Sequence, residues 1–124
     1  MMLNIVYFED DRRPTRNDKF KSFIEKSGYG DIIKFVSSID VDTMSSLAAD
    51  GVICHSGMVG YEIVSHFAKL NNWPILSYSG TVDSTPYLRE NKFSKNQFSV
   101  DGDYFELVLP EFIERCNAIK ESGN

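Results

Sequence analysis

The chain has 124 residues, with 13 Lys plus Arg and 18 Asp plus Glu, so its formal net charge is −5. This length fits one domain over residues 1–124, and the acidic balance without a Lys/Arg run argues against nucleic-acid binding. No apolar stretch reaches the ~18 residues of a membrane span, and residues 1–5 have neither the basic start nor the long apolar core of a signal peptide, so we expect none. Two cysteines, Cys54 and Cys116, lie far apart in apolar contexts. We expect a cytoplasmic protein with reduced thiols.

The first half of the chain alternates short apolar runs with amphipathic ones. Residues 3–8 are apolar and β-branched and stop at acidic residues, which is typical of a buried strand. Pro14 predicts the start of a helix, and a glycine-containing turn ends it. Residues 31–36 are a second strand candidate. An aspartate, Asp40 or Asp42, is positioned to cap a short helix after it.

The second half continues the alternation. Three further strands are predicted, at residues 51–54, 75–78 and 97–100. Apolar spacing predicts helices between them and at the end of the chain, with a weak one at 86–91 and stronger ones at 63–70 and 105–121. Pro110 is expected near the start of the last helix, because proline damages a helix interior.

Five strands alternating with helices predict an α/β fold with one doubly wound, five-stranded parallel sheet. Ligands of such sheets bind at the carboxyl ends of the strands, so the residues just after each strand are the functional candidates. No glycine-rich phosphate loop follows the first strand, which argues against a nucleotide- or flavin-binding domain.

Acidic and polar residues follow the predicted strands. The first strand ends in Glu9, Asp10 and Asp11, whose repulsion is unfavourable unless water or a cation offsets it, and hard divalent cations prefer such oxygen ligands. The alternative is a solvated acidic turn that begins the first helix, where negative charge suits the helix dipole. The later strands are followed by His55, Ser79 and Asp101.

Over residues 3–121 this layout resembles a response-regulator receiver (CheY-like) domain. That family has an acidic pair after strand one, a phosphoacceptor Asp at the end of strand three, a Ser/Thr after strand four and Lys-Pro after strand five. The resemblance implies strand order 2-1-3-4-5. It places Glu9 and Asp10 at the magnesium-binding pair, with Asp11 beside them, and Ser79 at the switch hydroxyl.

Two positions depart from the family pattern. His55 stands at the phosphoacceptor position, and Asp101-Gly102 replaces Lys-Pro, unless an earlier fifth strand lets Lys92 or Lys95 supply the amine. His55 cannot form an acyl phosphate, and Asp101 would repel phosphate, so the pocket suits a cation better than a phosphoryl group. We therefore expect a stand-alone pseudo-receiver, not an enzyme, that binds a protein partner or itself without aspartyl phosphorylation.

His55 has two interpretations. It is either a strand-end histidine hydrogen-bonded to Glu9 or Asp10, or a pH- or metal-sensitive group whose pKa the carboxylates raise. The second interpretation gives an alternative function, a small divalent-metal sensor or enzyme built on Glu9, Asp10, His55 and Asp101.

Aromatic residues make up 13% of the chain, and most are expected in the core. Those on and between the fourth and fifth strands are candidates for an exposed partner surface, because interface cores are enriched in aromatics. They are Tyr78, Tyr87, Phe93 and Phe98.

Overall fold

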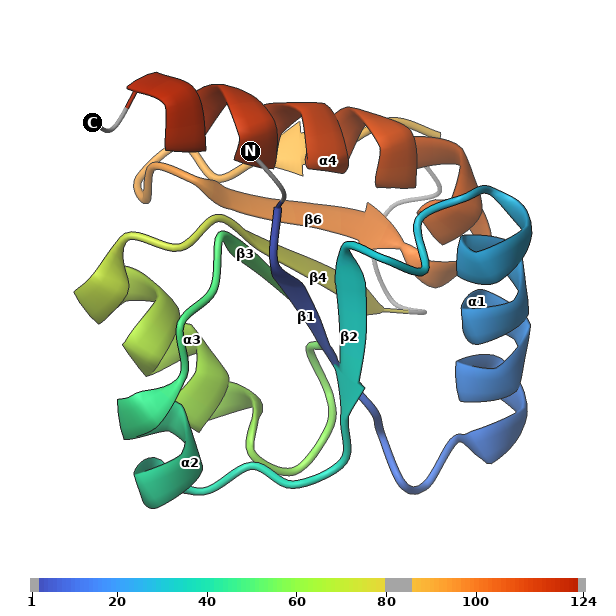
Figure 1. The fold of residues 1–124 in the computed structure, drawn as a ribbon, viewed down its shortest axis with the longest axis horizontal. Helices are drawn as coiled ribbons and strands as arrows, with labels where there is room; N and C mark the ends of the chain where they lie inside the picture. Colours follow the sequence, from blue (N-terminus) through green and yellow to red (C-terminus); the bar gives the residue numbers. More distant parts are fainter. Residues whose placement is uncertain (1–2, 80–85, 123–124) are drawn as a thin grey trace.

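A sheet runs through the centre of the molecule (Figure 1), in a computed structural model that describes residues 3–79 and 86–122. In these residues its strands are β1 (Ile5–Phe8), β2 (Ile33–Val36), β3 (Gly51–His55), β4 (Ile75–Ser79), β5 (Arg89–Glu90) and β6 (Gln97–Asp101). The helices are α1 (Pro14–Lys26), α2 (Val41–Ser46), α3 (Tyr61–Asn71) and α4 (Phe105–Ser122), and the 3-10 turn η1 (Gly102–Tyr104) precedes α4. None of the helices in this described part is long and apolar enough to cross a membrane.

The sheet has six strands within the described residues, in the order β2-β1-β3-β4-β6-β5. All neighbouring strands pair in parallel except β5, which is antiparallel to β6. When the five parallel strands are numbered along the chain, their order across the sheet is therefore 2-1-3-4-5. The prediction of a purely parallel, five-stranded sheet is wrong at the edge beyond β6, where β5 adds a sixth, antiparallel strand.

Residues 86–91 do not form the short helix that was predicted. Instead Arg89 and Glu90 pair with Ser99 and Phe98 of β6, and Asn91 N donates to Gln97 O at 2.7 Å. A six-residue helix is marginal on its own because its nucleation is costly. Pairing with β6 satisfies backbone groups that an open sheet edge would leave unpaired.

Helices cover both faces of the sheet because successive strand residues point to opposite sides. In β1, Ile5 and Tyr7 pack in a core under α1 and α4, whereas Val6 and Phe8 pack in a second core under α2 and α3 (Figure 1). The two cysteines are free and buried, one in each core.

Local sequence signals explain most helix ends. Pro14 opens α1, and Gly28, with a φ of 85°, follows its end in the left-handed region that favours glycine. Of the two capping candidates before α2, Asp40 is the cap and accepts a hydrogen bond from Thr43 N at 2.7 Å. Pro110 lies inside α4 and not at its first position. Its exposed ring faces solvent, so the helix loses one backbone hydrogen bond near its start without a clash in the core.

Candidate functional site

The carboxyl ends of the parallel strands lie along one edge of the sheet and bring distant residues together. β1 leads into Glu9 and Asp10, and β3 ends at His55. On the neighbouring strands Ser79 lies beside Asp101 in register. This edge is where ligands of doubly wound sheets bind.

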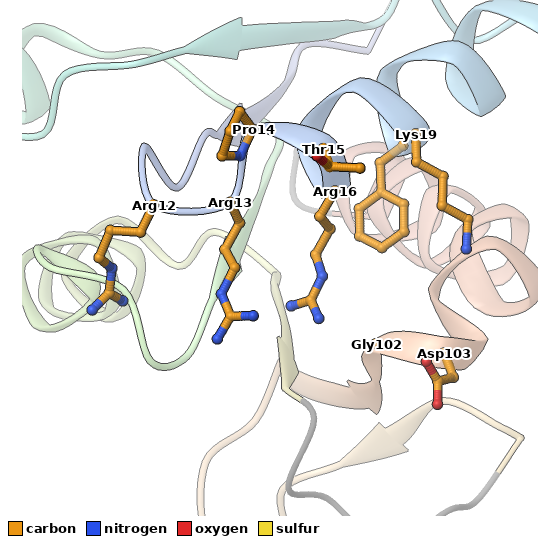
Figure 2. Close-up of a pocket in the computed structure, with 9 residues that line it drawn as sticks. Arg12, Arg13, Pro14, Thr15, Arg16, Lys19, Gly102 and Asp103 are labelled. Carbon is orange, nitrogen blue, oxygen red and sulfur yellow. The ribbon is translucent and has the colours of Figure 1, made fainter.

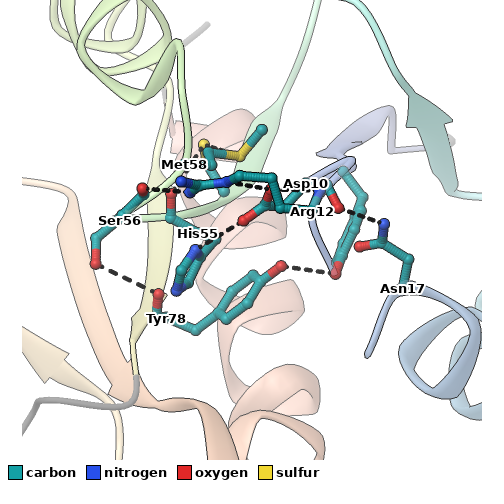
Figure 3. A network of polar contacts seen from close by, with 10 residues as sticks. Asp10, Arg12, Asn17, His55, Ser56, Met58 and Tyr78 are labelled. Carbon is teal, nitrogen blue, oxygen red and sulfur yellow. Dashed lines mark hydrogen bonds and ion pairs between the residues drawn. The ribbon is translucent and has the colours of Figure 1, made fainter. Parts of the chain in front are cut away.

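Asp10 and His55 form a buried pair at this edge (Figure 3). His55 Nδ1 lies 3.1 Å from Asp10 Oδ2, and the two residues are 7% and 2% exposed. An ionised carboxylate can only accept, so Nδ1 carries the proton and Nε2 of the neutral ring is an acceptor. The structure therefore contains the hydrogen bond to Asp10 that the first interpretation of His55 predicted.

Arg12 occupies the other oxygen of the same carboxylate. Asp10 Oδ1 accepts from the Arg12 backbone N at 3.0 Å and from its Nε at 3.3 Å. Arg12 Nη2 also donates to Gly57 O at 2.6 Å, which ties the loop after β1 to the loop after β3. Asn17 Nδ2 donates to Asp10 O at 2.9 Å and anchors the same loop to α1 (Figure 3).

The electrostatics follow from these contacts. Burial by itself raises the pKa of Asp10, but the hydrogen bonds and charge of Arg12, with the hydrogen bond to His55, outweigh it, so this pKa lies below its usual value. For His55 burial is the largest influence and lowers its pKa, against the opposing effect of Asp10, and the charges of Arg16 and Arg13 lower it further. Asp10 raises the pKa of His55, as expected of a neighbouring carboxylate, but burial and the two arginines outweigh it, so the net shift is downward. His55 is neutral at pH 7.

The other predicted acidic residues do not converge on this pair. Glu9 lies 4.0 Å from Lys21 Nζ, and Asp11 is exposed. Asp101 is 6% exposed and caps η1 by accepting from Asp103 N at 2.9 Å. Within residues 3–79 and 86–122 no hydrogen bond or ion pair joins Asp101 to Asp10 or His55, and no three His, Cys, Asp or Glu side chains are grouped to hold a metal ion.

The position of β6 also decides the question of a replacement lysine. β6 spans Gln97–Asp101, so Lys92 and Lys95 precede its amino end. They lie at the opposite end of β6 from Asp101, and the strand that precedes them, β5, is antiparallel to β6, so neither lysine stands at the carboxyl end of a parallel strand.

A hydrogen-bonded pair of buried tyrosines reaches His55 through Tyr78. Tyr7 and Tyr78 share a hydrogen bond of 2.8 Å between their hydroxyl groups, and burial raises the pKa of Tyr78 to about 12. The Tyr78 ring centre is 5.2 Å from that of His55. His55 therefore packs against the ring of Tyr78, whose hydroxyl group stays protonated at neutral pH.

The predicted partner surface divides into core and exposed residues. Tyr78 and Phe98 are 1% and 3% exposed and belong to the core, so their assignment to a surface is wrong. Strand alternation turns both side chains inward against the helices. Tyr87 and Phe93 are 58% and 95% exposed.

A basic pocket beside the pair was not predicted. A cavity of about 410 Å³ is lined by Arg12, Arg13, Arg16 and Lys19 on one side and by Gly102 and Asp103 on the other. Figure 2 shows the three guanidinium groups extending to the same side of the loop that leads into α1. Its sequence signal is the run Asp11-Arg12-Arg13-Pro14-Thr15-Arg16, but the acidic residues before this run and the acidic net charge predicted a cation site instead.

Comparison with known proteins supports the fold. The solution structure of SdrG from Sphingomonas melonis Fr1 is similar to this chain, with a TM-score of 0.55 at 14% sequence identity. The match covers 90% of this chain and 97% of SdrG. No protein-family model matches the sequence, and curated proteins give no significant match. At this identity the likeness shows a shared α/β fold.

Proposed function

We propose that the protein is a degenerate receiver-like signalling module that acts by binding a protein partner or itself, without aspartyl phosphorylation. The observation that carries the proposal is His55 at the end of β3, buried and hydrogen-bonded to Asp10. By the resemblance to receiver domains, this is the position of the phosphoacceptor carboxylate. The strand order and the fold shared with SdrG support placing His55 there.

The chemistry at this edge is unfavourable for an acyl phosphate. A phosphoacceptor carboxylate needs a free oxygen to attack the phosphoryl donor. Both oxygens of Asp10, the carboxylate closest to His55, already accept hydrogen bonds, from His55 and from Arg12. A reaction at Asp10 would first have to break these contacts in a buried site, which costs free energy.

Exposed aromatics near β5 support the partner-binding part of the proposal. Phe93 is 95% exposed and Tyr87 is 58% exposed, beside the short edge strand. Large aromatic side chains dominate the energetics of protein interfaces when they become buried. We propose Tyr87 and Phe93 as the centre of the partner surface.

The alternative function, a divalent-metal sensor or enzyme, has less support. It requires Glu9, Asp10, His55 and Asp101 to share one cation, but Asp10 binds Arg12 and Asp101 caps η1. A guanidinium on the central carboxylate competes directly with a cation for the same oxygens.

Amide NMR spectra with beryllofluoride and magnesium test the proposal, because this reagent mimics a phosphoryl group on a carboxylate. We expect no magnesium-dependent shifts at Asp10, at His55 or in the strands that carry them. The Asp10→Asn variant is the matched control, since any shift that depends on the Asp10 carboxylate disappears in it. Magnesium-dependent shifts centred on Asp10 and lost in Asp10→Asn would contradict the proposal.

A further inference from the structure

Two of the four basic side chains that line the cavity beside α1 have no ion-pair partner among the described residues. We call the site formed by Arg12, Arg13, Arg16 and Lys19 the arginine pocket. Arg12 pairs with Asp10, and Lys19 lies 3.9 Å from Glu106. Within the described part of the chain, neither Arg13 nor Arg16 has an ion-pair partner. Arg16 lies over the Tyr78 ring, 5.9 Å from its centre, and no ion pair neutralises either arginine.

The start of α1 adds to this positive potential. Arg13 is the N-cap residue and makes no capping hydrogen bond with its side chain. The first backbone N–H groups of a helix lack partners within the helix and carry partial positive charge. The influence of the arginines already reaches His55, whose pKa Arg16 and Arg13 both lower.

We propose that the arginine pocket binds the phosphate group of a small phosphorylated molecule. Guanidinium groups donate pairs of parallel hydrogen bonds that match phosphate oxygens. A cavity of about 410 Å³ has the size of a small-molecule site. The proposal does not depend on the proposed function, because it concerns side chains of α1 and not a phosphoacceptor at His55.

The opposite wall gives the proposal a second, independent test. Asp103 contributes a carboxylate to the same cavity and is exposed. Its charge repels a bound phosphate, so removing it must strengthen binding, whereas removing arginines must weaken it. A pocket that only stabilises the fold would not give these opposite effects.

Calorimetric titration with pyrophosphate is the direct experiment, at about 0.01 M ionic strength, where charges are screened only beyond about 30 Å. We expect saturable binding to the wild type. The double variant Arg13→Gln/Arg16→Gln should bind about tenfold more weakly or worse, because each charge-assisted hydrogen bond lost is worth about that factor. Asp103→Asn should tighten binding by up to about fivefold.

The control Lys26→Gln/Lys69→Gln removes the same number of positive charges at sites away from the pocket, the end of α1 and the end of α3. We expect it to bind pyrophosphate as the wild type does. Amide shift mapping on the wild type should place the largest changes at residues 12–19 and 102–103, a readout that needs no variant.

Three results would overturn the proposal. The first is no saturable binding by the wild type. The second is an equal loss of affinity in the pocket variant and in the control, which would show attraction by overall charge alone. The third is binding of citrate as tightly as pyrophosphate, which would make carboxylates and not phosphates the ligand class.

Discussion

Asp10 illustrates how a buried charge is retained at the end of a strand. Asp10 is 2% exposed, yet its carboxylate stays ionised because the guanidinium and backbone N–H of Arg12 and the ring of His55 donate to it. Buried charges are tolerated when they are paired and hydrogen-bonded in this way. The same contacts join the loops after β1 and β3.

Replacing this carboxylate tests its structural role. Asp10→Asn removes the charge and turns an NH2 group toward one of the donors that now face Asp10. We expect a loss of about 1–3 kcal/mol in the free energy of unfolding, measured by urea denaturation, because a buried donor is left unsatisfied. Asp11→Asn, at an exposed neighbour, should change it by less than about 0.5 kcal/mol. Equal effects at both positions would contradict the importance of the buried contacts.

His55 gives the stability a defined pH dependence. Its pKa is lowered on folding from the ordinary value of 6.5, so the unfolded chain binds the proton more readily than the native protein. The contribution of neutral His55 is complete above pH 6.5 and is lost as the pH falls below it. The lowered pKa of Asp10 affects stability at more acidic pH, where the contribution of this residue to stability decreases only as its carboxylate becomes protonated.

Stability measured between pH 7.5 and 5.5 should therefore fall with pH in the wild type and less in His55→Gln, which keeps a side-chain donor but does not titrate. In a His66→Gln background His55 is the one remaining imidazole, because the chain has 2 His. Its NMR titration midpoint should lie below 6.5. A midpoint above 6.5 would reverse the sign of the effect.

At the scale of elements, residues close together in sequence around β5 and β6 lie partly in the core and partly on the surface. Phe98 packs against Phe112 of α4 with a ring separation of 6.0 Å, whereas Phe93 projects from the connection between the two strands with 95% of its area exposed. The two phenylalanines are five positions apart and have opposite environments. The difference follows from strand alternation in β6 and from the loop before it.

This difference predicts opposite outcomes for the same substitution. Phe98→Ala should cost about 3–5 kcal/mol of unfolding free energy, because it leaves a cavity in the core. Phe93→Ala should cost less than about 0.5 kcal/mol, as surface substitutions usually do. Urea denaturation of both variants measures this directly. A large loss at Phe93 would mean that its side chain packs against the protein, which would remove it from the proposed partner surface.

The parallel strands and the longer helices were predictable from local sequence. Buried parallel strands appear as short continuous apolar runs, as in Ile5–Phe8, and helices show their apolar spacing and capping residues such as Asp40. β5 was not predictable, because two polar residues carry no periodicity and become a strand only by pairing with β6. The strand order came from the resemblance to receiver domains, since periodicity does not determine it.

At the scale of the whole molecule, the net charge of −5 conceals a local excess of positive charge. The sequence placed Glu9, Asp10 and Asp11 at the correct edge of the sheet but did not show how they are neutralised. The arginines that follow them within a few residues supply both the partner of Asp10 and the wall of the arginine pocket. The directions of the side chains decide which charges pair, and the amino-acid composition carries no information about these directions.

The fold is therefore that of an α/β module whose strand edge carries a histidine–carboxylate–arginine network and a basic pocket beside it (Figures 2 and 3). Binding of a phosphate group in the arginine pocket and phosphorylation of an aspartate at this edge are different events. Reversible binding in the arginine pocket leaves the protein covalently unchanged, whereas a working receiver acquires a phosphoryl group on a carboxylate.

Intact-mass spectrometry after incubation with acetyl phosphate and magnesium tests whether any carboxylate at this edge is phosphorylated. We expect no phosphoryl adduct, either in the wild type or in Arg12→Gln, where the side-chain contact of Arg12 with the Asp10 carboxylate has been removed. A magnesium-dependent phosphoryl adduct on the wild type that maps to a carboxylate at this strand edge and is lost in Asp10→Asn would contradict it.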